Sequence, residues 1–308
     1  MRIAVVGSYG VGLTMRVRRA PDAGETVAGG VFSSGHGGKG SNQAVAAARL
    51  GATVSLLTAV GPDSFGRAAR DLWAAEGVSS ERVVTAEAAT MVGVILVDEA
   101  GENRIAIAPG ALDQLSAADV DGFEDEIAAA DLLVTGFEIP LDVARRALTV
   151  ARRHGVPTLV NPAPAPSEPL DAELWGLVDV LTPNLTEARQ LTGEYGAASA
   201  EDCAAAIRRR YAGVTVITLG ADGCLVDPPV GDRLRVAAVR PRQVVDTTGA
   251  GDAFTGALAV ALARGDGVAD AVRFASAAGS CSVAIAEVVP SLPRPGDITA
   301  LLAEQATP

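Results

Sequence analysis

Residues 246–254 read DTTGAGDAF and combine residue types that suit chemistry on an anion. The apolar run after them predicts a helix over residues 252–264, so Gly249, Ala250 and Gly251 lie where that helix begins. Free N–H groups and a partial positive charge at a helix N-terminus bind anions, and small residues let the anion approach the backbone closely. Asp252 would face the same anion and can accept a proton from an attacking hydroxyl. Aspartate is also a favoured N-cap, so this stretch alone leaves a structural role open.

A second glycine-rich loop, in residues 35–52 (GHGGKGSNQAVAAARLGA), leads into an Ala-rich segment that predicts a helix. We expect Ser41 or Asn42 to be the N-cap of this helix and Gly51 to end it. Lys39 in the loop can pair with phosphate or sugar oxygens, and a surface lysine in a tight turn is the alternative.

Neither glycine-rich loop is a standard nucleotide motif. Gly40 follows Lys39, so the G-K-[ST] of a Walker A loop is absent. Residues 7–12, GSYGVG, do not give G-x-G-x-x-G. A P-loop NTPase and a standard NAD domain are therefore disfavoured.

A third stretch, TPNLTEA in residues 182–188, has Asn184 and Glu187 at the spacing of a capping box. The functional alternative places Asn184 near nucleotide phosphates and has Glu187 hold Mg²⁺ through waters. Mg²⁺ prefers few carboxylates and several waters, so a single glutamate suffices for this reading.

Short β-branched runs alternate with Ala-rich helical stretches along most of the chain. The predicted strands are residues 2–7, 53–61, 132–136, 157–162, 178–184 and 214–220. The predicted helices between them are residues 41–50, 64–76, 141–153, 186–192 and 201–211. This alternation predicts an α/β fold with a parallel, Rossmann-like sheet covered by helices on both faces.

Two regions break the alternation, residues 13–33 and 91–108, and the second contains the hairpin signal EAGEN. We expect them to form a separate small antiparallel sheet, discontinuous in sequence. The α/β core would then comprise residues 1–12, 34–90 and 109–308. A small sheet over the carboxyl edge of a parallel sheet can act as a lid, and an ordinary edge hairpin is the alternative.

Charge and composition exclude several classes of partner. A net charge of −12 disfavours nucleic-acid binding through a broad basic surface, and a phosphate ligand would need local lysine, backbone N–H groups or Mg²⁺. The three cysteines are far apart and only two histidines occur, which disfavours a disulfide framework and a zinc site. The first apolar run is too short for a signal peptide, and no run of about 18 apolar residues appears. These features predict a cytoplasmic protein without a membrane partner.

Taken together, the motifs resemble the ribokinase-like (PfkB) family of sugar and nucleoside kinases. The match runs in order through AGETVAGG, GGKGSNQAVAAARLGA, NPAPA, TPNLTEA, VITLG and DTTGAGDAF. The resemblance implies a Rossmann-like core with a β-sheet lid that often serves as a dimer interface. It also implies transfer of the ATP γ-phosphate to a sugar hydroxyl with Mg²⁺.

The resemblance implies roles for individual residues, although NPAPA (161–165) receives no side-chain role. The catalytic group is the base Asp252 with an anion hole from Gly249, Ala250 and Gly251. The sugar-binding group is Gly38, Lys39, Asn42, Glu138 and Asp252. The nucleotide-binding group is Asn184, Thr218, Gly220 and Gly251, with Glu187 on the Mg²⁺ side.

The first loop departs from the ribokinase pattern G-S-x-N-x-D, in which Asn and Asp bind ribose hydroxyls. Here Gly10 and Gly12 stand at those two positions. A hydrogen bond to a charged group contributes about 1.5–3 kcal/mol, so the loss of both partners predicts poor ribose binding. The missing side chains also leave room, and we expect a larger or differently substituted sugar.

A second departure lies in VAIAEVVPS, residues 283–291. Potassium-activated members usually have a glycine-containing turn there, and Glu287 stands where that glycine would lie. Asp246 and Thr248 can still contribute ligands to a monovalent cation. Activation by K⁺ is thus left open.

The resulting prediction is an ATP-dependent carbohydrate kinase that forms a homodimer through its β-lid. A nucleoside kinase of the same fold would need an apolar or aromatic wall for the base. Aromatic residues are 4% of the chain, and Tyr9 and Phe32 are the only ones expected near the sugar site. A sugar-binding regulator without turnover is the third candidate, disfavoured by the retention of Asp252.

Overall fold

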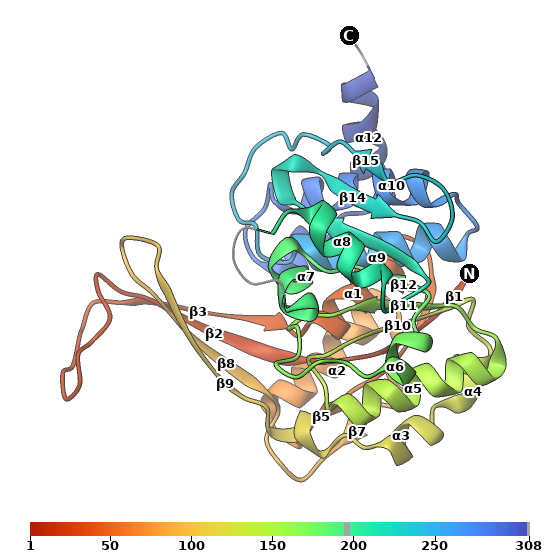
Figure 1. The fold of residues 1–308 in the computed structure, drawn as a ribbon. Coiled ribbons are helices and arrows are strands. Elements are labelled where there is room, and N and C mark those ends of the chain that lie inside the picture. The colour runs from red at the N-terminus through yellow and green to blue at the C-terminus, as the bar shows by residue number, and fades with distance from the viewer. Residues whose placement is uncertain (194–197, 307–308) are drawn as a thin grey trace.

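A nine-stranded sheet forms the centre of the computed structural model, which describes residues 1–193 and 198–306 (Figure 1). Its strands are β1 (Arg2–Val6), β4 (Thr53–Leu57), β6 (Val78–Ser79), β10 (Leu132–Gly136), β11 (Thr158–Asn161), β12 (Val180–Leu181), β13 (Val214–Thr218), β14 (Cys224–Asp227) and β15 (Leu234–Val236). They lie in the order β15-β14-β13-β12-β11-β10-β1-β4-β6, and all pairs from β13 to β6 are parallel. The predicted α/β fold is confirmed, whereas the antiparallel edge of β14 and β15 was not predicted.

Helices cover both faces of the sheet. They are α1 (Lys39–Arg49), α2 (Ser64–Glu76), α3 (Ala117–Asp121), α4 (Glu124–Ala128), α5 (Leu141–His154), α6 (Ala172–Gly176), α7 (Leu185–Thr192), α8 (Ala200–Arg208), α9 (Ala250–Ala263), α10 (Val268–Ser282), α11 (Val288–Ser291) and α12 (Pro295–Ala306). Six of them, α1, α2, α5, α7, α8 and α9, correspond to predicted helices, whereas the other six were not predicted. Short 3₁₀ turns cover Gly110–Gln114 and Gly220–Asp222. None of the helices among the described residues is long and apolar enough to span a membrane.

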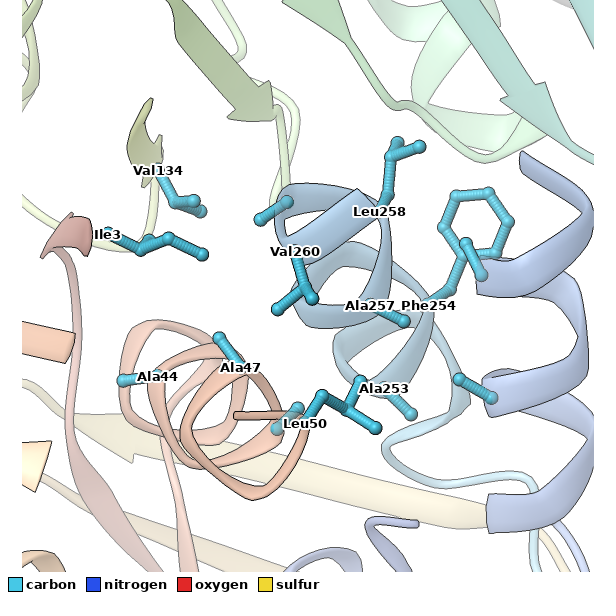
Figure 2. Close-up of a cluster of buried hydrophobic side chains, with 14 of the residues drawn as sticks. Ile3, Ala44, Ala47, Leu50, Val134, Ala253, Phe254, Ala257, Leu258 and Val260 are labelled. Atoms are coloured by element: carbon cyan, nitrogen blue, oxygen red, sulfur yellow. The ribbon is translucent and has the colours of Figure 1, made fainter. Parts of the chain in front are cut away.

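Each strand of the central sheet sends apolar side chains to both faces, so the protein has two hydrophobic cores. In β1, Ile3 and Val5 belong to the core beneath α1, α9 and α10, while Ala4 and Val6 belong to the core beneath α5. Figure 2 shows the first core, where side chains of α1 and α9 meet those of the strands. Because both faces are covered, ligands can reach the sheet only at its edges, and the polar residues gather at the carboxyl edge.

A smaller sheet projects from the body as an arm (Figure 1). Its strands are β2 (Gly10–Arg16), β3 (Val31–Gly37), β8 (Val92–Val97) and β9 (Asn103–Ala108), in the order β3-β2-β8-β9. The two hairpins are antiparallel as expected, but β2 and β8 run parallel, so the expectation of an antiparallel sheet is wrong at this pair. The reason is topological: the hairpins are separate excursions from the core. Two further short strands, β5 (Ala59–Val60) and β7 (Val84–Thr85), pair with each other.

Candidate active site

Asp252 lies in the first turn of α9, where two side-chain amides hold its carboxylate. Asn42 Nδ2 donates to Asp252 Oδ2 at 2.8 Å, and Gln43 Nε2 donates to Asp252 Oδ1 at 3.1 Å. The side chain is buried, and Gly249 caps the helix with a φ of 83°. Burial raises the pKa of Asp252, against the opposing effects of Lys39 and of the two amide hydrogen bonds. The carboxylate is thus fixed in orientation and more basic than an exposed aspartate.

The close approach of α1 and α9 that permits these contacts depends on Gly256. A Cβ at Gly256 would lie 2.6 Å from Ala46 Cβ and 2.8 Å from the Gln43 carbonyl oxygen. Residues 252 and 256 are one turn apart on α9, so this contact brings Asp252 next to Asn42 and Gln43. Gln43 was not predicted as a site residue, although it directly follows Asn42.

The start of α1 differs from the prediction. The helix begins at Lys39 after Gly38, whose φ is 87°, and no side chain caps it. Ser41 and Asn42 do not act as N-caps because their side chains serve tertiary contacts. The hydroxyl of Ser41 accepts a hydrogen bond from Trp73 Nε1 at 2.8 Å, and Asn42 holds Asp252. Gly51, with a φ of 93°, follows the end of the helix as expected.

The loop before α1 packs directly against the carboxyl end of β1. A Cβ at Gly38 would lie 2.5 Å from Tyr9 Cα, and one at Gly40 would lie 2.6 Å from the backbone of Gly7. This packing brings the backbone N–H of Lys39 within 2.9 Å of Glu138 Oε2. Ser8 Oγ donates to the same carboxylate oxygen, a contact that the sequence did not predict.

Lys39 is the only lysine in the chain, and three carboxylates surround it. Burial would lower its pKa, but Asp252, Glu138 and Glu187 raise it to a greater extent. The ammonium group is therefore a fixed positive charge in a site that is otherwise acidic. This residue is the local cation that a phosphate ligand requires in a chain with a net charge of −12.

Asn161 links this group to the neighbouring strands. Its Oδ1 accepts from Gln43 Nε2 at 3.2 Å, and its Nδ2 donates to the Thr182 carbonyl at 2.8 Å. Its position at the carboxyl end of β11 is the one sequence feature that indicates a site residue, whereas its hydrogen-bond partners depend on the tertiary fold.

Two cavities open beside these residues. The first, of about 220 Å³, is lined by Lys39, Asp252, Gly251, Asn184, Thr218 and Glu187 among others. The second, of about 660 Å³, contains Asn184, Thr218, Gly220 and Arg235. Because Asn184 and Thr218 line both, the two cavities are neighbours, and the larger one has a volume typical of small-molecule sites. Phe254 also lines the smaller cavity, so a third aromatic side chain, in addition to the expected Tyr9 and Phe32, lies near Asp252.

The capping box that was predicted at α7 is formed. Asn184 Oδ1 accepts from the Glu187 N–H, and Glu187 Oε2 accepts from the Asn184 N–H, both at 2.8 Å. Burial is the main cause that raises the pKa of Glu187. Its carboxylate still borders the smaller cavity, so the structural and ligand-binding interpretations are compatible.

The turn that precedes α9 holds the three small residues expected to bind an anion. A Cβ at Gly249 would lie 2.6 Å from Val288 Cγ1, so only glycine fits there. The Ala250 N–H donates a long hydrogen bond of 3.3 Å to the Thr247 carbonyl, while Gly249 and Gly251 line the smaller cavity. The first-turn amides of α9 thus lie at the wall of the cavity that contains Asp252.

Asp246 lies below this turn and accepts two backbone hydrogen bonds, from Thr248 at 2.9 Å and from Glu287 at 3.2 Å. Burial would raise its pKa, but the Thr248 hydroxyl, these two backbone hydrogen bonds and the charge of Arg16 together lower the pKa below the ordinary value. Among the described non-glycine residues, Glu287 alone has a positive φ, of 67°. The backbone at this position therefore has the conformation that glycine adopts most easily.

Gly10 and Gly12 were expected to leave open space in the sugar site, and the structure differs from this expectation at Gly10. A Cβ at Gly10 would lie 2.4 Å from Met91 Cε, so the side chain of Met91 fills the space that was expected to be open. At Gly12 the nearest atoms are Ile95 Cδ1 at 3.6 Å and the Gly35 carbonyl oxygen at 4.0 Å, which leaves room for a small group.

Comparisons with known proteins show which family the chain is similar to. The pattern of the pfkB family carbohydrate kinases matches residues 2–294. The chain is 37% identical over 284 residues to a ribokinase of Haemophilus influenzae, which covers 91% of this chain and 92% of that protein. It is 36% identical over 264 residues to a deoxyribokinase of Salmonella typhi, with 84% and 85% covered. A solved structure of Arabidopsis thaliana ribokinase complexed with ribose and ATP superposes with a TM-score of 0.92 at 28% identity, over 98% of each chain. The chain therefore belongs to the pfkB family of carbohydrate kinases.

Proposed function

We propose that this kinase transfers the γ-phosphoryl group of ATP to a hydroxyl of a small sugar, with Asp252 as the base. The observation that carries the proposal is the buried Asp252 carboxylate, held by two amides beside the only lysine and at the first turn of α9. A base, a fixed cation and a helix N-terminus are the parts that phosphoryl transfer requires.

In the proposed reaction the substrate hydroxyl lies within hydrogen-bond distance of the Asp252 carboxylate. As its oxygen attacks the γ-phosphorus, the hydroxyl proton moves to Asp252, the bond between the γ-phosphorus and the β–γ bridging oxygen breaks, and ADP leaves. Lys39 and the amides of Gly249, Ala250 and Gly251 stabilise the negative charge on the transferring group. Asn42, Gly38 and Glu138 hold the sugar, while Asn184, Thr218 and Gly220 lie on the nucleotide side.

The donor set fits Mg²⁺ held largely by water and phosphate. No group of three or more His, Cys, Asp and Glu residues suited to a metal occurs within residues 1–193 and 198–306. Glu187 is one carboxylate at the cavity wall, which is the kind of donor that Mg²⁺ uses through its waters. When bound, Mg²⁺ would neutralise phosphate charge.

Asp246 and Thr248 are proposed to support a monovalent cation such as K⁺. Equal reaction rates in potassium and tetramethylammonium buffers would contradict this.

We further propose that ribose is not the best substrate. Gly10 and Gly12 offer no side-chain hydrogen bonds, and a buried hydroxyl without a partner is unfavourable. The test is Mg²⁺- and ATP-dependent ADP release with a panel of pentoses, hexoses, sugar acids, polyols and nucleosides. A single strong non-ribose sugar supports the proposal, whereas ribose above all others contradicts it. A nucleoside as best substrate would favour the nucleoside kinase alternative, and sugar binding without turnover would favour a regulator.

The small sheet of β2, β3, β8 and β9 is proposed to act as a lid and as the interface of a homodimer. Its large apolar side chains Val31, Phe32, Val94, Ile105 and Ile107 are exposed in the single chain. Val31, Ile105 and Ile107 share one face of the sheet, and a second copy of the sheet on that face would cover them, as expected for an apolar patch. Light scattering after size exclusion should give twice the chain mass, and Ile105→Arg should give the monomer. A monomeric wild type would contradict the proposal.

A further inference from the structure

We infer that the face of the small sheet that meets the sugar site is an apolar wall built by Met91 and Ile95, and that it selects a sugar lacking a hydroxyl on that side, a deoxy sugar. This inference rests on the proposed kinase function and deepens it. It assigns substrate selection to two residues that neither the sequence motifs nor the comparisons identify.

The first part of the wall is the contact between Gly10 and Met91. Gly10 lies two residues after Ser8, which donates to Glu138, and its N atom would be 2.9 Å from a Cβ at Gly38. Gly10 is therefore part of the sugar end of the site. Met91 Cε and Cγ would lie 2.4 and 3.1 Å from a Cβ at Gly10, so the thioether chain occupies the space of a side chain there. Met91 is 7% exposed, and its place is fixed by a hydrogen bond from the Val11 N–H to its carbonyl.

The second part of the wall follows from the register of the strands. Alternate residues of a strand share one face, so Gly12 lies on the same face as Gly10. Gly12 is paired with Gly93 of β8 and Gly35 of β3. Ile95, two residues after Gly93, reaches back so that its Cδ1 lies 3.6 Å from a Cβ at Gly12. Gly10, Gly12, Gly35 and Gly93 together with Ile95 carry no side-chain hydrogen-bonding group. Thr14, which pairs with Ile95, is the first polar side chain on this face beyond Gly12.

The orientation of this face toward the core is given by Gly35. Glu287 Oε2, from the segment next to Val288 and Gly249, would lie 3.9 Å from a Cβ at Gly35. The same face of the small sheet that carries Gly10 and Gly12 therefore looks toward the turn that precedes Asp252. A sugar held between Asp252 and this face would have one edge against Met91 and Ile95.

An apolar wall discriminates between sugars because it cannot form a hydrogen bond with a hydroxyl that faces it. A hydroxyl pressed against Met91 or Ile95 would lose its hydrogen bonds to water and gain none. A methylene at the same place packs favourably against the thioether and the branched chain. Because an apolar pocket rejects an added hydroxyl only moderately, we expect a preference of about 10- to 100-fold for the deoxy sugar.

The test compares kcat/KM for 2-deoxyribose and ribose, which share the same primary hydroxyl. Wild type should prefer 2-deoxyribose, mainly through KM. The exchange variant Gly10→Asn with Met91→Gly removes the thioether chain and places an amide there, with the carbonyl oxygen of residue 91 still 3.0 Å from the Cβ position. The ratio should move toward ribose by about tenfold. Met91→Gln, which changes polarity at nearly constant length, should move the ratio in the same direction and serves if the exchange variant does not fold.

A matched pair of substitutions on β8 provides the control. Ile95→Thr places a hydroxyl on the wall and should lower the preference for 2-deoxyribose. Val94→Thr makes a similar change on the opposite face of the same strand, where Val94 is exposed, and should leave the ratio unchanged.

Equal or better turnover of ribose by wild type would overturn the inference, as would an unchanged ratio in Met91→Gln and Ile95→Thr, or a nucleoside preferred over both sugars. If no sugar is phosphorylated, the proposed function fails instead. Calorimetric titration of the protein with the same two sugars then tests the inference independently of turnover. Tighter binding of 2-deoxyribose than of ribose supports the inference, and equal or weaker binding overturns it.

Discussion

Asn42 and Asp252 are 210 positions apart in sequence and are joined by a 2.8 Å hydrogen bond from Asn42 Nδ2 to Asp252 Oδ2. The other end of the same amide, Asn42 Oδ1, is buried and has no hydrogen-bond partner among the described residues. Buried polar atoms are rarely left unpaired, so an acceptor at this place is suited to a substrate hydroxyl. One side chain would thus orient both the base and the group it deprotonates.

Replacement of Asn42 by alanine should lower kcat/KM about 10- to 100-fold, because a hydrogen bond to a charged group contributes about 1.5–3 kcal/mol. Steady-state kinetics with the best sugar of the panel measures this. The neighbouring Ser41→Ala is the control, since Ser41 contacts Trp73 and not Asp252. It should cost stability and leave kcat/KM nearly unchanged. Equal loss of activity in both variants would contradict a specific role for Asn42.

The pH dependence of the rate should report the raised pKa of Asp252. Catalysis requires the carboxylate, so kcat/KM should fall as the pH falls through a pKa above the ordinary aspartate value of about 4. Glu187, whose pKa is also raised, is the competing source of such a limb. Glu187→Gln should therefore keep the acid limb in whatever activity remains. A limb at or below about pH 4 would refute the assignment.

The same pKa shift predicts how Asp252→Asn affects stability. Because the folded pKa exceeds the unfolded one, the folded state binds the proton more tightly, and ionisation destabilises it as the pH rises through the folded value. The asparagine variant should therefore have at least the wild-type free energy of unfolding at pH 7. Its advantage should vanish below the unfolded pKa of about 3.9. If the Asn42 amide turns over, its Oδ1 can accept a hydrogen bond from the side-chain amide that Asp252→Asn introduces, so the contact between the two side chains is kept. Urea unfolding at both pH values measures the difference, and a variant less stable at pH 7 would contradict it.

Gly256→Ala should separate α9 from α1. Its Cβ would lie 2.6 Å from Ala46 Cβ, and overpacking of this kind costs about 1–3 kcal/mol. The shift should also lower kcat, because Asp252 moves away from Asn42 and Gln43. Gly296→Ala is the control: no atom lies within 4 Å of its Cβ position in α12, so it should be neutral or stabilising by up to about 1 kcal/mol. Thermal unfolding and kinetics together test this, and wild-type kcat in Gly256→Ala would be inconsistent with it.

Glu287→Gly should stabilise the protein by about 1 kcal/mol, because a non-glycine residue at a φ of 67° costs about 1–3 kcal/mol and glycine relieves it. Glu287→Ala removes the carboxylate and keeps the backbone strain, so it should show no such gain. The difference in melting temperature between the two variants is the measurement. A glycine variant that melts no higher than the alanine variant would rule out backbone strain at Glu287.

Local sequence patterns predicted six of the helices and the capping box of Asn184 and Glu187, because these depend on neighbours within one or two turns. The parallel sheet was predicted from the alternation of strands and helices along the chain. The N-cap of α1 was wrong because tertiary partners, Trp73 and Asp252, take the side chains of Ser41 and Asn42. The contact of Ser8 with Glu138 and the role of Gln43 were not predicted for the same reason, since the partners Glu138 and Asp252 lie far along the chain. The filling of space at Gly10 by Met91 depends on how the small sheet is assembled, which no local pattern describes.

Lys39 is also the only lysine at which this chain can be acylated, because every other residue among its lysines and arginines is an arginine. Acylation of a lysine, by a reagent or by a cellular acyl donor, can occur at one side chain only. There it would remove the single ammonium charge that Asp252, Glu138 and Glu187 face, and leave three carboxylates uncompensated. In this chain, the fraction of lysine that is acylated therefore equals the fraction of active sites that have lost their ammonium charge.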